Sequence, residues 1–351
     1  MIGYCYCTRE QVKRALDHAE SARNDVLVDR AARAATETIE GTTHRQFVPT
    51  TAVRSFRWPA VIPSASYRLW LDGCDLISAT AVVAGGVTID AGDYLLEPVN
   101  FGPPYTRIEI DLSSSAALSA GATAQRAIAI TGVWGYSAST LAAGALAEAL
   151  DITETAVDVT DSAEAGIGDV IAVDSERMLV VGKAMLSTGV AIDVGDALTA
   201  SAADVGITAS ALPGIPIVGE TIAVDSERML VVDVAGLLVT VRRAWDGTAL
   251  AAHAGGAAIY APRTLTVTRG ALGTTATTHL SAAAVTRHVV PGLINTWAIA
   301  EAMDTLLQEG SGYARTAGTG DAAREYGGTA LKDLRERGYN TYGRKFRKGV
   351  V

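Results

Sequence analysis

The stretch IAVDSERMLVV occupies residues 171–181 and recurs without a change at residues 222–232, 51 positions further along the chain. A looser echo follows, in which Arg, Gly, Thr and His repeat at matching intervals, first at Arg243, Gly247, Thr248 and His253 and then at Arg269, Gly273, Thr274 and His279. Repeats at periods of this size indicate duplicated structural units, each of which buries its own apolar face. They favour a building block over an enzyme, because one catalytic centre does not need a second copy.

Each copy predicts a β-hairpin in which an apolar strand, an Asp-Ser turn and a second strand follow one another. Further strands are expected at Val239–Arg243 and Leu265–Arg269, and both lead into a Gly-Thr turn. Met178 and Met229 hold equivalent places in the two hairpins, and both are expected to be buried between sheets. Residues 137–290 are therefore predicted to form an inserted all-β repeat domain of one or two small barrels or sandwiches.

Residues 1–46 show helical periodicity. Thr8 and Gln11 have the spacing of a capping box, which predicts the start of a helix. A second helix carries a stripe of apolar and small residues that could pack within the subunit or between subunits, and the sequence leaves both open. The stripe consists of Leu27, Ala31, Ala34, Ala35, Thr38 and Ile39.

Residues 47–136 change to strand periodicity, with short β-rich runs separated by Gly, Pro and Asp. Helices return near Pro291 and again from about Thr329, the latter expected to end at Gly338. The predicted fold class is α+β, in which N- and C-terminal helices form a helical bundle with a small antiparallel β segment, and the all-β repeat domain is inserted into it. The predicted parts are residues 1–136, 137–290, 291–338 and a basic tail, 339–351.

The charge is acidic overall and unevenly distributed. The formal net charge is −9, and residues 140–290 carry 17 acidic against 8 basic residues, which argues against a general nucleic-acid binder. Cys5, Cys7 and Cys74 lack the spacing of a zinc site and predict free thiols in a reducing compartment. Neither an N-terminal apolar leader nor an apolar run of about 18 residues is present, so no secretion signal and no membrane span is expected.

Two sets of polar residues could ligate a cation or act in catalysis. Asp174, Ser175 and Glu176, with their copies at residues 225–227, could ligate a cation, since oxygen-rich loops bind Ca²⁺. A hairpin turn with a buried Glu–Arg contact is the favoured interpretation. His253 and His279 lack a neighbouring nucleophile motif and are predicted to stabilise turns. No catalytic residue, metal ligand or cofactor site is assigned, and an enzyme is not expected.

The C-terminal tail interleaves basic and aromatic residues, a composition suited to phosphate backbones or to docking on an acidic partner. Docking on a partner or a neighbouring subunit is the favoured hypothesis, and a solvated terminus without a partner is the alternative. The predicted partner-binding residues are Tyr339, Tyr342, Arg344, Lys345, Phe346, Arg347 and Lys348.

The order of motifs resembles the head–tail connector (adaptor) proteins of long-tailed bacteriophages. The resemblance lies in YCTREQV at residues 6–12, YRLWLDG and LISATAVVAGG at residues 67–86, ITGVWGY at residues 130–136 and VPGLINTWAIAEAM at residues 290–303. It covers roughly residues 4–136 and 288–338. In that family the strand ending in a Gly-Val-Trp-Gly-like sequence leads almost directly into a Pro-initiated helix, so residues 137–290 look like an insertion.

The resemblance implies a virion structural protein of the neck, assembled in the host cytoplasm. Such adaptors form a twelve-fold homo-oligomeric ring below the portal protein, continue the DNA channel without sequence-specific binding, and dock the next neck or tail component, a stopper or tail terminator. No membrane partner is implied. The competing hypothesis is a β-repeat binding module that recognises host-surface polysaccharide or another virion protein, in which case the insertion would carry the function.

Overall fold

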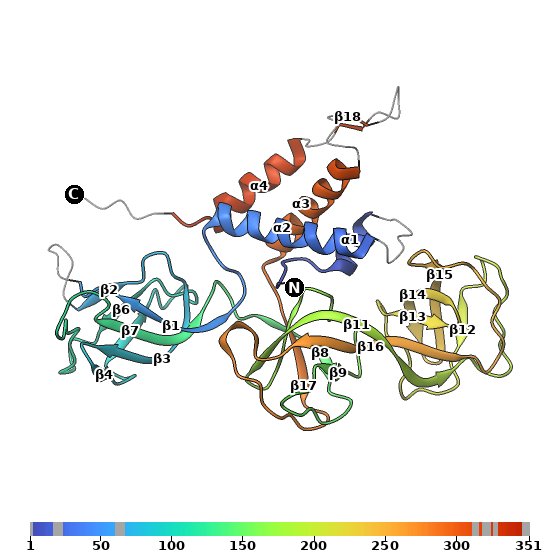
Figure 1. Ribbon diagram of the computed structural model, residues 1–351, viewed down its shortest axis with the longest axis horizontal. Coiled ribbons are helices and arrows are strands. Elements are labelled where there is room, and N and C mark those ends of the chain that lie inside the picture. Colours follow the sequence, from blue (N-terminus) through green and yellow to red (C-terminus); the bar gives the residue numbers. More distant parts are fainter. Residues whose placement is uncertain are drawn as a thin grey trace.

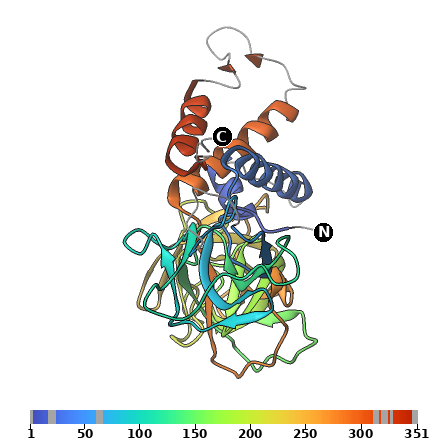
Figure 2. The same cartoon turned by 90° about the vertical axis from the view of Figure 1, so that its left-hand side faces the viewer.

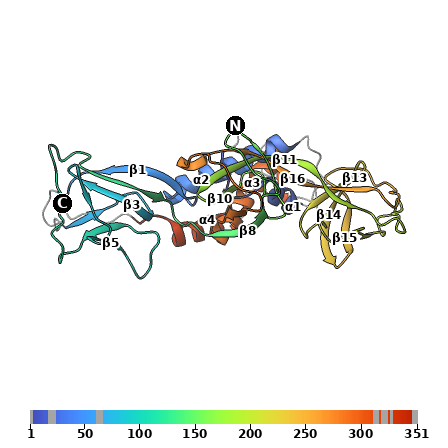
Figure 3. The ribbon, with the colours of Figure 1, turned by 90° about the horizontal axis from the view of Figure 1, so that it is seen from below.

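The structure, a computed structural model, describes residues 3–16, 24–59, 67–310, 316–317, 324–325 and 329–345. Three β units lie side by side along the longest axis, and a helical unit sits on one side of this row (Figures 1 and 2). Seen from below, the row runs from a sheet domain (residues 50–56 and 68–134) through a first barrel (residues 140–185 and 262–288) to a second barrel (residues 186–261) (Figure 3). Both ends of the described chain contribute to the helical unit.

The helical unit contains α1 (Arg9–Leu16), α2 (Asp25–Thr43), α3 (Gly292–Gly310) and α4 (Thr329–Tyr342). The predicted capping box is confirmed, because the Gln11 N–H donates to Thr8 Oγ1 over 3.1 Å and the Thr8 N–H donates to Gln11 Oε1 over 3.0 Å. Only part of the predicted apolar stripe on α2 packs within the subunit. Ala31, Ala35 and Ile39 are core residues, whereas Leu27 and Thr38 face away from the core.

Helix α4 does not end at Gly338, as the sequence suggested, but continues to Tyr342. A Cβ atom at position 338 would lie 2.5 Å from Cε3 of Trp297 on α3. The glycine therefore serves close packing between two helices and not chain reversal, because a helix tolerates glycine where a neighbouring side chain takes the space. Trp297 is fully buried by this contact and by α2.

The sheet domain packs two antiparallel sheets on one core. The larger sheet has the order β1 (Thr50–Phe56), β7 (Ile128–Trp134), β3 (Leu76–Ala84) and β4 (Val87–Ile89), and the smaller has the order β2 (Arg68–Trp70), β6 (Arg107–Ile110) and β5 (Tyr94–Glu97). Burial alternates along β7, since Ile128, Ile130 and Trp134 point into the core between the sheets.

The first barrel is formed by residues 140–185 and 262–288. Its strands are β8 (Thr140–Ala145), β9 (Ala156–Asp158), β10 (Val170–Val173), β17 (Ala284–His288) and the outer halves of two long strands, β11 (Glu176–Ala191) and β16 (Ala258–Thr268). A bridge between Leu146 and Val159 joins the ends of β8 and β9 and closes the barrel.

The second barrel is formed by residues 186–261. It contains β12 (Gly206–Thr208), β13 (Thr221–Val224), β14 (Glu227–Ala235), β15 (Leu238–Trp245) and the remaining halves of β11 and β16, and a bridge between Ile192 and Ala209 closes it. In the sequence, the second barrel is thus inserted into the first, between residues 185 and 262. In space the two barrels lie side by side, and strands β11 and β16 run through both. One further short pair, β18 (Thr316–Ala317) with β19 (Arg324–Glu325), lies between α3 and α4 in the sequence.

The two barrels are copies of each other over their whole length, well beyond the repeated hairpin. Both predicted hairpins are present, with Val173 opposite Glu176 and Val224 opposite Glu227. Matching side chains fill the two cores. They are Leu146, Leu150, Val157, Val159, Ile171, Val173, Met178, Val180, Leu265, Val267 and Val285 in the first barrel and Ile192, Leu198, Ile207, Ala209, Ile222, Val224, Met229, Val231, Val239, Val241 and Ile259 in the second.

The predicted fold class is wrong in its proportions. The chain is mostly β-sheet, with 37% of residues in strands and 20% in helices, and it is not a helical bundle with a small β segment. The sheet domain has its own two-sheet core, and the barrels add a ten-stranded sheet. The helices form a separate unit beside these β units. Within the described residues, no helix is long and apolar enough to cross a membrane.

Candidate functional sites

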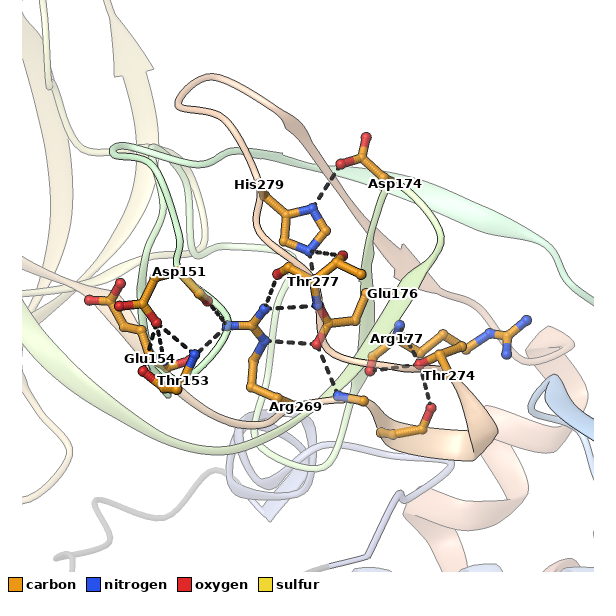
Figure 4. A network of polar contacts seen from close by, with 12 residues as sticks. Asp151, Thr153, Glu154, Asp174, Glu176, Arg177, Arg269, Thr274, Thr277 and His279 are labelled. Carbon is orange, nitrogen blue, oxygen red and sulfur yellow. Dashed lines mark hydrogen bonds and ion pairs between the residues drawn. The ribbon is translucent and has the colours of Figure 1, made fainter.

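A buried polar network holds the hairpin of the first barrel (Figure 4). The Glu176 carboxylate is fully buried and accepts two hydrogen bonds from Arg269, from Nε over 2.7 Å and from Nη2 over 2.9 Å. The backbone N–H groups of Gly270 and Thr277 each donate to it over 2.9 Å. His279 lies between two carboxylates, with Nε2 2.9 Å from Glu176 and Nδ1 2.8 Å from Asp174.

The second barrel repeats this network. Arg243 donates from Nε and Nη2 to the two oxygens of Glu227, both over 2.8 Å, and His253 bridges Glu227 and Asp225. Arg243 and its counterpart Arg269 also donate to backbone carbonyls of the loops that close each barrel. Each network therefore ties a hairpin to loops that are distant in the sequence, and every oxygen of its glutamate is used.

The two networks are structural and unsuited to acid–base chemistry. Burial by itself would raise the pKa of Glu176, but the hydrogen bonds from Arg269, His279, Thr277 and Gly270 lower it to about 2. The pKa of Glu227 is lowered to about 2 by the equivalent contacts. A carboxylate held this firmly in its charged form is a poor proton carrier near neutrality.

The predicted Glu–Arg contact and the turn-stabilising histidines are thus confirmed. The calcium alternative for Asp174, Ser175 and Glu176 loses its main ligand, because the Glu176 oxygens are occupied by Arg269. In the part of the chain that the structure describes, no group of three or more His, Cys, Asp and Glu side chains is arranged to hold a metal ion.

A looser polar contact lies where the first barrel meets the helical unit. Asp169 accepts the Gly166 N–H over 2.8 Å, and its other oxygen lies 3.8 Å from Arg287 Nη1. In the second barrel the equivalent acid is Glu220, which is one methylene longer and forms a close two-fold pair with Arg263 at 2.9 Å. Arg287 donates from Nη2 to Glu164 over 2.9 Å, and its Nε has no partner among the described residues.

Burial raises the pKa of Asp169 to about 7, against the opposing effect of the nearby Arg287 guanidinium. At this site the folded state therefore binds a proton more tightly than the unfolded chain, so the contribution of Asp169 to stability is most favourable below about pH 4 and becomes less favourable as the pH rises through 7. In the sequence, Gly168-Asp169 and Gly219-Glu220 stand at equivalent places just before the two identical stretches. Their arginine partners do not repeat in the sequence, so no pattern marked either pair.

We expect Asp169→Asn to raise the free energy of unfolding by about 2 kcal/mol at pH 8 and to leave it nearly unchanged at pH 4, because the neutral amide removes the cost of a buried charge. Urea unfolding of both proteins at several pH values measures this difference. Exposed Asp233, changed to Asn, controls for the altered net charge. A wild-type pH profile that the Asp169 substitution does not alter would contradict the assignment.

Two of the predicted partner-binding residues, Tyr342 and Arg344, contact other parts of the same chain. Tyr342 packs edge-on against Phe47 and Tyr136, with ring centroids 5.8 and 5.4 Å away. Arg344 pairs with the buried carboxylate of Asp75 over 2.8 Å. Of the basic tail predicted for residues 339–351, Tyr342 and Arg344 therefore pack on the chain itself.

The remaining predicted partner-binding residues divide into two groups. Tyr339 and Lys345 are exposed, and their role in docking stays a prediction. Phe346, Arg347 and Lys348 lie outside the described residues. The sequence held no sign that Asp75 would receive Arg344, because Asp75 stands alone between apolar residues and the two positions are far apart in the chain.

Comparison of the chain with protein-family models, curated proteins and solved structures finds no match.

Proposed function

We propose that this chain is a virion structural protein, a head–tail adaptor that forms a ring below the portal, continues the DNA channel and docks the next neck or tail component. The proposal rests on the resemblance described above and on the path of the chain. Strand β7 and helix α3, which are adjacent in such adaptors, are separated here only by the two nested barrels. The segments that carry the resemblance form the sheet domain and the helical unit.

The amino-acid composition of α3 supports self-association of the chain. A helix with apolar side chains on all sides is typical of one buried on all sides, and α3 carries them around its whole circumference. Its fully buried residues, Ile294, Trp297, Ala298, Glu301 and Ala302, lie toward α2 and α4. Leu293, Ala300 and Leu307 lie seven residues apart on one line and belong to no core cluster of the described residues.

This line of half-buried residues on α3 suits a contact with a second copy of the chain. A contact between two different faces of identical subunits closes into a ring when its rotation permits. Small Ala300 at the centre of the line lets a neighbouring helix approach closely. The acidic barrels suit a particle through which DNA slides without sticking. The virion neck is then the location, with assembly in the host cytoplasm.

A mass measurement of the purified chain, alone and with the portal protein, tests the proposal. We expect the wild type to form a closed multiple of the 36.3 kDa subunit, alone or on the portal, because the α3 line is covered only in the assembly. Ala300→Glu should give a folded monomer, whereas Val194→Asp, at an 85% exposed position of the second barrel, should assemble normally. A wild-type chain that stays monomeric with portal present would overturn the proposal.

A further inference from the structure

The duplicated barrels carry two copies of one docking face, and the first copy is occupied by the chain's own N-terminal segment. The carbonyl of Gly168 accepts the Cys5 N–H over 2.9 Å, and that of Ile167 accepts the Arg9 N–H over 3.2 Å. The Ile167 N–H in turn donates to Oε2 of Glu10 over 3.0 Å. The first turn of α1 thus satisfies both backbone groups of Ile167, through the Arg9 N–H and the Glu10 carboxylate, while the irregular stretch before it binds Gly168.

The occupied face is built for close approach. A Cβ at Gly166 would lie 2.6 Å from the Thr8 side chain, and one at Gly168 would lie 3.1 Å from Cβ of Cys5. Residues 165–170 are buried throughout. The first barrel therefore needs this face covered.

The equivalent face of the second barrel is residues 216–221, of which Ile217, Val218 and Gly219 correspond to Gly166, Ile167 and Gly168. Here Ile217 is 38% exposed and Val218 is 50% exposed. Among the described residues, the N–H and the carbonyl of Val218 have no hydrogen-bond partner, although their counterparts in the first barrel have both.

A cleft of about 490 Å³ lies between this second face and α1. Gly219 and Thr221 line the cleft on the side of the second barrel, and Lys13 and Arg14 line it from α1, whereas Val218 is not part of the lining. Arg14 donates to the Gly219 carbonyl over 2.6 Å, and within the described chain its guanidinium forms no ion pair with a carboxylate. The unpaired backbone groups of Val218 therefore lie next to Gly219, where Arg14 reaches the second face from α1.

We infer that the second face, beside this cleft, binds a segment of another protein chain in the manner in which the first face binds residues 5–10, as an irregular stretch that leads into the first turn of a helix. The bound segment runs across Val218 and Gly219, covers Ile217 and Val218 with apolar or small side chains, and places one carboxylate near the Val218 N–H and Arg14. This carboxylate takes the part that Glu10 plays in the first barrel. The inference concerns the second barrel alone and holds whether or not the chain forms a ring.

The test uses the full chain and a labelled peptide with the sequence of residues 3–11, with serine in place of Cys5 and Cys7. Fluorescence anisotropy measures its affinity, and hydrogen exchange locates its binding. We expect saturable binding below about 1 mM, with new protection of the Val218 N–H, whereas the Gly219 N–H already donates to Val231 without the peptide. Ile217→Gly, which restores the glycine of the first face, should tighten binding about tenfold, since the Thr8 position of the peptide then fits.

Three comparisons make the result specific. A peptide with glutamine at the Glu10 position should bind about tenfold more weakly. Val218→Asp should abolish binding, because it places a charge where the segment lies. Val194→Asp, equally charged and on the same barrel, should bind as the wild type does. Absence of binding to the wild type, binding only to Ile217→Gly, or binding that Val218→Asp does not weaken would each overturn the inference.

Discussion

Glu176→Ala is expected to destabilise the first barrel by about 3–5 kcal/mol, a loss typical of a buried ion pair from which one partner is removed. The substitution leaves the Arg269 guanidinium without its carboxylate, together with the N–H groups of Gly270 and Thr277. Water cannot replace the carboxylate readily, because the Glu176 side chain has no exposed surface. Chemical unfolding followed by circular dichroism, with hydrogen exchange on β10 and β11, measures the loss.

Asp174→Asn is the matched control, since Asp174 contacts the same histidine but is 68% exposed. It should cost less than about 1 kcal/mol. Acid provides a second control. The pKa of Glu176 is about 2 in the folded chain and near 4.5 otherwise, so its contribution is present above pH 4.5 and is lost as the pH falls toward 2. If Glu176→Ala and Asp174→Asn cost the same, the network would not hold the barrel together.

The repeated hairpins and their polar networks could be predicted because the information is local or duplicated. Identical stretches at residues 171–181 and 222–232 predict the same hairpin twice. In each barrel the Glu of the hairpin pairs with the Arg of the looser repeat, Glu176 with Arg269 and Glu227 with Arg243, which explains why both residue types recur. The short strands between residues 67 and 134, such as β4 (Val87–Ile89), also lie in the region that was predicted to hold short β-rich runs between turn residues.

The nesting of the barrels could not be predicted, because it depends on two strands that each belong to two cores. Along β11, Val180 faces the first core and Val190 faces the second, yet the strand between them reads as one β-rich run. Two ion pairs were missed for a related reason. Asp169 with Arg287, and Asp75 with Arg344, join residues more than a hundred positions apart, and nothing in their local sequence marks either member.

Gly338 shows how one residue type supports two predictions. A glycine after a short amphipathic segment is typical of a helix end, and the same glycine permits two helices to touch. Which use applies is decided by Trp297 on a different helix, and a local pattern does not contain that partner. The predicted balance of helix and strand was wrong for another reason. The helices do pack mainly on one another, but the sheet domain and the barrels hold most of the chain, which is 37% strand and 20% helix.

Met229→Asp is expected to unfold the second barrel while leaving the first barrel and the helical unit folded. Met229 is fully buried in the second core, and a charged carboxylate there has no partner, a cost of several kcal/mol. The first barrel survives because its two parts then enclose one long loop, and the entropy of closing a loop grows only slowly with its length, by roughly 0.6 kcal/mol for each doubling.

Met178→Asp provides the matched variant, because Met178 holds the equivalent place in the first core and is also fully buried. Its effect should be wider. Unfolding the first barrel releases both ends of the ribbon formed by β11 and β16, and the second barrel needs that ribbon for two of its strands. Hydrogen exchange should therefore show protection lost in residues 186–261 alone for Met229→Asp, and in both barrels for Met178→Asp. Equal loss in both variants would mean that the barrels unfold as one unit, and intact protection at β13 and β14 in Met229→Asp would mean that this side chain does not face the second core.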